Sequence, residues 1–202
     1  MLKKEMFHFS RKAKIFIGFL IIVVGGYFAS SLLWGSSAVP ADFEDARLQG
    51  ALIAENIIRL SSESANDLAR VNKLEGERKF SEALDITSRM LTQSQEIRAQ
   101  AVDLSKEIER MTLALPSIRP VGAQQAALSA ITDRLALISR LINYSAGLEQ
   151  LLGALRGRFM GYPGNHQVQN IIEQINNEVT AINHFNSEAV KEMEKFDSLI
   201  AR

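Results

Sequence analysis

Apolar residues recur at intervals of three and four along most of the chain after residue 41, and this spacing constrains the fold more than any other feature. Residues at these intervals share one face of an α-helix. Four long segments follow the pattern, at about residues 42–75, 78–115, 122–156 and 165–201. No alternation of apolar and polar residues typical of a strand interrupts them. We therefore expect an all-α domain.

The breaks between these segments predict how the helices are connected. They fall at Gly76, at residues 116–122 and at residues 157–165. A segment of roughly 34 residues spans about 50 Å as a helix, and short connections between long helices favour antiparallel neighbours. We expect a long antiparallel up-down four-helix bundle over residues 42–202, with Asp42 capping its first helix. Positions that the spacing assigns to the core include Phe80, Leu84, Leu91, Leu128, Leu135 and Phe185.

Residues 15–34 form a run of 20 residues without a charge. As a helix this run would span about 30 Å, the thickness of the hydrocarbon core of a bilayer. Five basic residues precede it, whereas the sixteen residues after it contain one, Arg47. Because Lys and Arg favour the cytoplasmic side, we expect residues 1–14 to be a cytoplasmic tail. Residues 15–34 would then be a single-pass signal-anchor in the cell membrane, residues 35–41 a linker, and the bundle extracytoplasmic.

A cleaved signal peptide is the alternative for the amino-terminal region. The basic start and the small residues before a possible cleavage point at Ala38 fit such a peptide. The apolar core of a signal peptide usually has only about 7–15 residues. The longer run therefore favours an anchor that is retained.

Composition and motifs exclude several functional classes. Residues 41–202 contain 18 Lys and Arg against 22 Asp and Glu, a formal charge of −4, which provides no basic surface for nucleic acid. The chain has no cysteine for a disulfide or thiolate site. No phosphate-binding loop, nucleophile elbow or zinc motif occurs, and neither His166 nor His184 has a glutamate three residues before it. We expect no catalytic residue, metal or cofactor.

The connection before the last segment is the first candidate site. It carries three large apolar residues at one end of the expected bundle, Phe159, Met160 and Tyr162. Methionine and aromatic residues are enriched in the cores of protein interfaces, so these three could form a docking patch. Alternatively, they could fold inwards and close the end of the bundle.

The third segment has a second apolar line beside its first, and this line is the second candidate site. It consists of Leu137, Leu141, Tyr144, Leu148 and Leu151. Two lines can serve two surfaces, one for the core and one for a partner helix or a second copy. A single wide apolar face is the alternative.

Two smaller patterns complete the candidates. Small residues four or seven apart in the expected membrane span would allow two such helices to approach closely; they are Gly18, Gly25, Gly26, Ala29 and Ser30. Polar residues at similar heights in the bundle could form an internal polar layer; they are Ser64, Ser94, Ser145, Asn177 and Glu178.

These features predict a membrane-anchored helical bundle that is a structural or protein-docking module of the cell envelope. It would contact lipid through residues 15–34 and bind a protein partner or a second copy of itself. The alternative function is a sensory or small-ligand-binding bundle that signals through a membrane partner. The sequence favours the first because it offers no cytoplasmic effector beyond residues 1–14.

Overall fold

A computed structural model describes residues 39–162 and 168–201. It contains four long helices, α2 (Ala41–Gly76), α3 (Phe80–Ala114), α4 (Val121–Phe159) and α5 (Val168–Ile200), and the short 3-10 turn η2 (Leu115–Ser117). No strand occurs in these residues. The prediction of an all-α fold is therefore confirmed.

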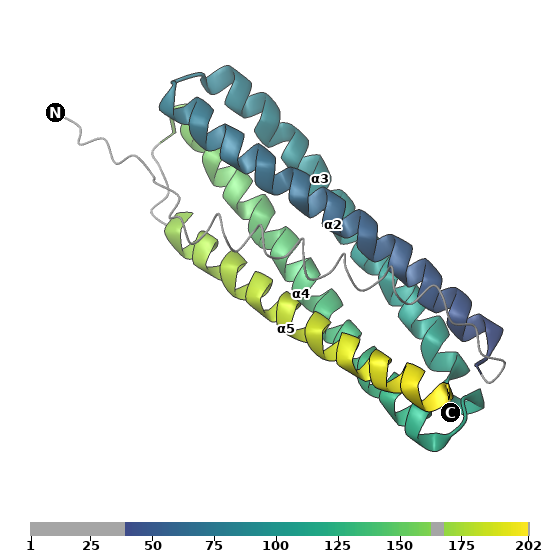
Figure 1. Ribbon diagram of the computed structural model, residues 1–202. Helices are drawn as coiled ribbons and strands as arrows, with labels where there is room; N and C mark the ends of the chain where they lie inside the picture. Colours follow the sequence, from purple (N-terminus) through teal and green to yellow (C-terminus); the bar gives the residue numbers. More distant parts are fainter. Residues whose placement is uncertain (1–38, 163–167, 202) are drawn as a thin grey trace.

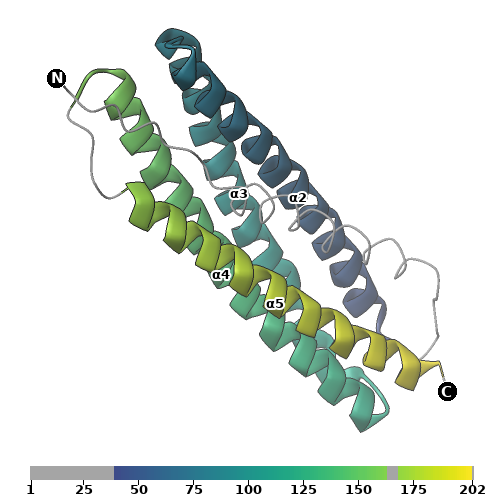
Figure 2. The same ribbon diagram turned by 60° about the vertical axis from the view of Figure 1, so that its left-hand side comes forward.

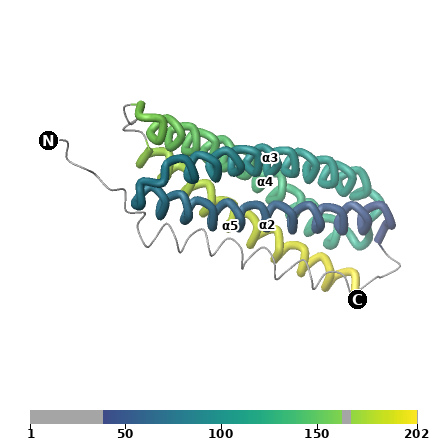
Figure 3. The backbone as a smooth tube through the Cα atoms, turned by 90° about the horizontal axis from the view of Figure 1, so that it is seen from above, coloured from purple at the N-terminus to yellow at the C-terminus, as the bar shows by residue number. Residues whose placement is uncertain are grey.

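The four helices lie side by side along one long axis, and successive helices run in opposite directions (Figures 1 and 3). Each helix packs most closely against its neighbour in the chain. The approach of α4 to α5 is especially tight at Gly147, where an added Cβ would lie 3.0 Å from Cγ1 of Ile175. The fold is thus a helical bundle built from consecutive antiparallel pairs.

The predicted core lines differ from the buried ones in three helices. In α3 the buried line begins at Ala83, Ile86 and Met90, while Phe80 is 43% exposed and Leu84 and Leu91 are only partly buried. In α4 both Leu128 and Leu135 are about half exposed, because the helix packs against α3 and α5 through a face centred on its other apolar line. In α5 Asn186 is buried and Phe185 is partly buried.

Helix ends also differ from the predicted ones. The carbonyl of Pro40, not the side chain of Asp42, begins α2 by accepting hydrogen bonds from the amides of Phe43 and Glu44. At the other end, α4 continues three residues beyond the predicted position 156 and includes Phe159. This extension places Phe159 within a helix rather than in a loop.

Two backbone hydrogen bonds from residues after α2 to carbonyls in its last turn close the connection between α2 and α3. The amide of Lys79 donates to the carbonyl of Leu74 and the amide of Arg78 donates to that of Glu75, with Arg78 at φ 61°. This is the geometry in which glycine is favoured after a helix, because a left-handed residue with a Cβ is strained. In the equivalent turn after α4, glycine occupies the left-handed position, Gly161 at φ 84°.

Replacing Arg78 by glycine is expected to stabilise the protein by about 1 kcal/mol, since it removes this strain. Urea unfolding followed by circular dichroism measures the change. The matched control is Arg78→Ala, which removes the same side chain and keeps the strained φ. Equal stabilities of the Gly and Ala variants would contradict the prediction.

The amino-terminal predictions lie outside the described residues. These are the cytoplasmic tail at 1–14, the anchor at 15–34 with its small residues Gly18, Gly25, Gly26, Ala29 and Ser30, and the linker up to residue 38. Within residues 39–162 and 168–201, no helix combines the length and the apolar character needed to cross a membrane.

Candidate functional site: the groove between α2 and α5

The four helices enclose their core on three sides only. Close backbone packing joins α2 to α3, α3 to α4, and α4 to α5. In the described part of the chain, α2 and α5 come together mainly where α2 begins and α5 ends, and their backbones diverge towards the other end (Figures 1 and 2). The seam between α2 and α5 is therefore the side of the bundle with the least backbone packing among the described helices.

A cluster of charged and aromatic side chains closes the foot of this seam. The guanidinium of Arg47 donates two hydrogen bonds to the carboxylate of Asp197, at 2.7 and 2.8 Å. The ring of Phe196 lies 5.3 Å from that of Phe43, and the Arg47 guanidinium lies 6.0 Å from the centre of the Phe196 ring. Glu44 borders the cluster, and burial raises the pKa of its carboxyl, an effect that Arg47 opposes. We call Phe43, Arg47, Phe196 and Asp197 the foot clasp.

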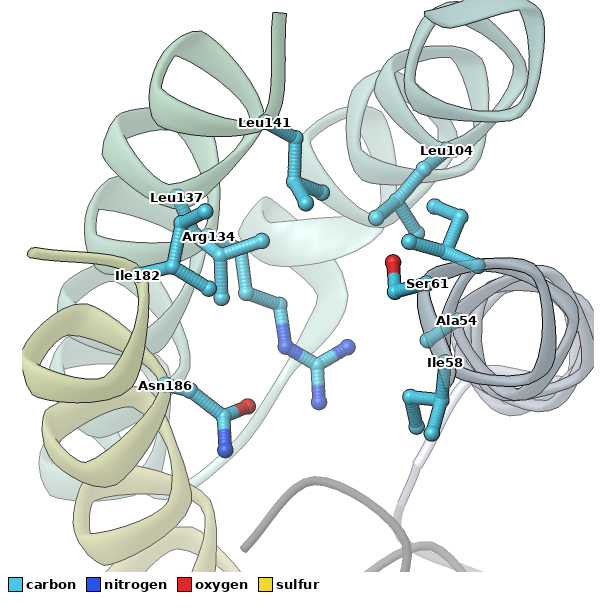
Figure 4. Close-up of a pocket in the computed structure, with 10 residues that line it drawn as sticks. Ala54, Ile58, Ser61, Leu104, Arg134, Leu137, Leu141, Ile182 and Asn186 are labelled. Atoms are coloured by element: carbon cyan, nitrogen blue, oxygen red, sulfur yellow. The ribbon is translucent and has the colours of Figure 1, made fainter. Parts of the chain in front are cut away.

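A cavity of about 50 Å³ lies above the foot clasp and is partly open to solvent between α2 and α5 (Figure 4). Its wall is mostly aliphatic and combines residues of all four helices. The lining residues are Ala54, Ile57, Ile58, Ser61, Leu104, Arg134, Leu137, Leu141, Ile182 and Asn186.

Three polar side chains point into this cavity from different helices: Ser61 from α2, Arg134 from α4 and Asn186 from α5 (Figure 4). All three are buried, with exposed fractions of 2%, 8% and 6%. In the described part of the chain, the Ser61 hydroxyl and the Asn186 Nδ2 atom have no hydrogen-bond partner. A buried polar group without a partner costs about 1–3 kcal/mol, so any occupant of the cavity, water included, is stabilised there by accepting hydrogen bonds from these groups.

This cavity was not predicted from the sequence. One signal was present: Arg134 is a charge in the buried line of a helix otherwise poor in charges. Ser61 and Asn186 gave no comparable signal, because neither residue type is unusual on an amphipathic helix.

The candidate docking residues at the distal turn separate into two groups. Phe159 is buried and stacks on Phe80, with ring centres 6.0 Å apart. Met160 and Tyr162 are exposed by 57% and 65%. Nearby, a salt bridge of 2.9 Å joins Arg158 of α4 to Glu75 of α2. Phe159 thus closes the end of the bundle, and the other two residues face outwards.

The candidate partner face on α4 is buried inside the bundle. Its five residues Leu137, Leu141, Tyr144, Leu148 and Leu151 are all at most 9% exposed. They belong to the intramolecular core. The alternative, a single wide apolar face on α4, therefore fits the structure, and this line is not exposed. Burial raises the pKa of the Tyr144 hydroxyl to about 12.

The predicted polar layer forms only in part. Ser94 donates a hydrogen bond of 2.9 Å to the carbonyl of Ser145, whose hydroxyl accepts one of 3.2 Å from Arg98 Nε. Ser64 donates instead to Gln93. Of the two expected α5 members, Asn177 is exposed and Glu178 lies 3.5 Å from Arg140 in a salt bridge. Of the predicted members, only Ser94 and Ser145 bond to each other, which joins α3 to α4, whereas Ser64 and Glu178 contact residues outside the predicted layer.

Metal-binding groups and known relatives give no further indication of function. Among the described residues, no three His, Asp or Glu side chains are close enough together to hold a metal ion. No protein-family model matches the chain, and no curated protein and no solved structure is significantly similar to it.

Proposed function

We propose that this protein is a structural or docking module of the cell envelope, tethered by residues 15–34. The uncharged run and the excess of basic residues before it support the tether and its orientation. The long bundle that follows would then carry its α2–α3 and α4–α5 turns away from the membrane. Such an arrangement suits a protein that presents one end to a partner.

The exposed apolar residues at this distal end carry the docking proposal. Phe80, which is 43% exposed, stacks on Phe159, and the exposed Met160 and Tyr162 follow Phe159 in the turn after α4. The α2–α3 turn and the end of α4 lie at the end of the bundle opposite the start of α2 (Figure 1). We call Phe80, Met160 and Tyr162 the distal tip. Its side chains offer large apolar contact area around the fixed ring of Phe159, a composition typical of interface cores.

Orientation can be tested with single cysteines, because the natural chain has none. Met160→Cys and Ser10→Cys are expressed separately in intact cells and treated with a membrane-impermeant maleimide. Met160→Cys is expected to react at once and Ser10→Cys only after the membrane is opened. The reverse pattern would contradict the orientation, and reaction of both in intact cells would contradict the anchor.

Docking can be tested by in-cell crosslinking of the full-length protein. The double variant Met160→Ser with Tyr162→Ser is expected to reduce capture of a protein partner roughly tenfold, since interface anchors contribute about 1–3 kcal/mol. The control is Leu113→Ser, which removes a side chain that is 75% exposed at the opposite end of the bundle. Both variants should melt within about 2 °C of the natural protein, because exposed substitutions change stability little. Undiminished capture by the double variant would contradict docking through the distal tip.

A further inference from the structure

We infer that the outward face of α4 binds the same face of a second copy of this chain, so that two bundles lie side by side in a parallel pair. This surface is on the flank of the bundle and is separate from the distal tip. Only the parallel direction rests on the proposed tether, because two copies held in one membrane by residues 15–34 point the same way.

Large apolar side chains gather on this face. Outside the distal tip, six such residues are exposed among those that the structure describes: Leu52, Val102, Leu113, Val121, Leu128 and Leu135. Three of them, Val121, Leu128 and Leu135, follow one another at intervals of seven along α4, with exposed fractions between 49% and 58%. Ile142, which is partly buried, continues the spacing. We call these four residues the outer line.

The interval of seven residues is the repeat with which one helix packs along another. The second position of this repeat holds Gln125, Thr132, Ser139 and Ala146, so that the face advances in steps of four and three. The core of the bundle already takes up the other apolar line of α4. Within the described residues no helix covers the outer line, whereas a second copy supplies a helix with the identical repeat.

The charge on this face fits its own copy. Every exposed residue of α4 from 121 to 153 is uncharged, whereas the exposed residues of α3 include Glu82, Asp85, Arg89, Glu96, Lys106 and Glu109. At the border with α5, Arg140 is paired with Glu178. In a parallel two-fold pair each residue meets its equivalent, so a charge on the face would meet a like charge. The uncharged face avoids this repulsion, and it offers no complement to a charged partner.

The available area also suits a dimer. Residues 121–146 span about 40 Å of helix, and neighbouring helices lie about 10 Å away. Val102 belongs to the α3 border, because it lies one turn from Arg98, which contacts Ser145 and Glu149 of α4. A strip about 20 Å wide centred on α4 then offers roughly 800 Å² per copy, the size of a standard interface. Since half of the repeat positions are small or polar, we expect a reversible pair.

The test crosslinks the full-length protein in intact cells through single cysteines with a short, membrane-permeant bismaleimide. Gln125→Cys and Thr132→Cys are expected to give at least tenfold more crosslinked dimer than Asn56→Cys. The control Asn56 is an exposed position of α2, which packs closely on α3 and not on α4. Equal yields at Thr132 and Asn56 would overturn the pair, and crosslinking at Thr132 without Gln125 would overturn its parallel direction.

Other occupants of the face give distinct results in the same experiment. A crosslink from Thr132→Cys to a different protein in place of a second copy would overturn self-association. Failure of Thr132→Cys both to crosslink and to react with a monofunctional maleimide would show that another part of the chain covers the face, which would also overturn it.

A charge on the outer line tests the contact directly. In the Thr132→Cys background, Leu135→Lys is expected to lower the dimer yield roughly tenfold, since two lysines would face each other. Leu52→Lys is the matched control, because Leu52 of α2 is also 49% exposed, and it should keep the full yield. The two lysine variants are expected to melt within about 2 °C of each other. An unchanged yield with Leu135→Lys would overturn the inference.

Failure of the pair and failure of the proposed function can be told apart. The crosslinker crosses membranes, so it reports pairing on whichever side the bundle lies, whereas labelling of Met160→Cys and Ser10→Cys reports the tether. Loss of the pair would leave docking through the distal tip unaffected.

Discussion

Replacing Phe196 by alanine is expected to lower the free energy of unfolding by about 4 kcal/mol, the largest effect of any single change proposed for this bundle. The ring is only 1% exposed and contacts the fully buried ring of Phe43. Truncation loses the apolar burial and leaves a cavity in the foot clasp. It also removes the aromatic face beneath the Arg47 guanidinium, an additional contribution of about 1 kcal/mol.

Chemical unfolding of the natural protein and the variant measures this effect. Phe80→Ala is the matched control, since it removes the same ring where it is 43% exposed, and we expect a loss of about 1 kcal/mol there. If the two variants were equally stable, the described burial of Phe196 would be wrong.

Replacing Asp197 by leucine is expected to destabilise the bundle by about 2–3 kcal/mol, below the usual cost of breaking a fully buried pair. The side chain of Arg47 is 8% exposed, whereas that of Asp197 is 44% exposed. Loss of the aspartate therefore leaves a buried guanidinium with less negative charge around it. The opposite change, Arg47→Met, should cost less, because water can solvate the remaining carboxylate.

The asymmetry between these two variants is the diagnostic result. Both are compared with the double variant, which replaces the whole pair by apolar side chains. We expect the double variant to be more stable than Asp197→Leu alone, because no charge then remains buried in the clasp. A double variant that loses the sum of the two single effects would argue against a direct interaction of these side chains.

The sequence predicted the helices well because their pattern depends on local periodicity. It predicted the buried line less well because burial depends on which neighbours a helix packs against. In α4 two apolar lines are available, and only the contacts with both α3 and α5 make the line through Leu141 and Leu148 central. At the start of α3, the same limitation left Phe80 assigned to the core in place of Ala83 and Ile86.

The candidate sites were harder to predict than the buried lines, because a site depends on which distant parts of the chain come together. Met160 and Tyr162 could be found because large apolar residues near a turn are conspicuous, although the longer α4 takes Phe159 out of that set. The cavity could not be found, since Ser61 and Asn186 lie 125 positions apart and line the same cavity only through the packing of the whole bundle. The pairing of Ser94 with Ser145 was within reach because both lie on helices that pack along their lengths.

Helix α2 is fastened near both of its ends, through Arg47 to Asp197 of α5 and through Glu75 to Arg158 of α4. Its middle turns, which carry Ala54 and Ser61, border the cavity. These two attachments favour widening of the cavity by outward bowing of the middle of α2 over displacement of either end. The length of α2 between Arg47 and Glu75 then sets how far its middle turns can move away from α5.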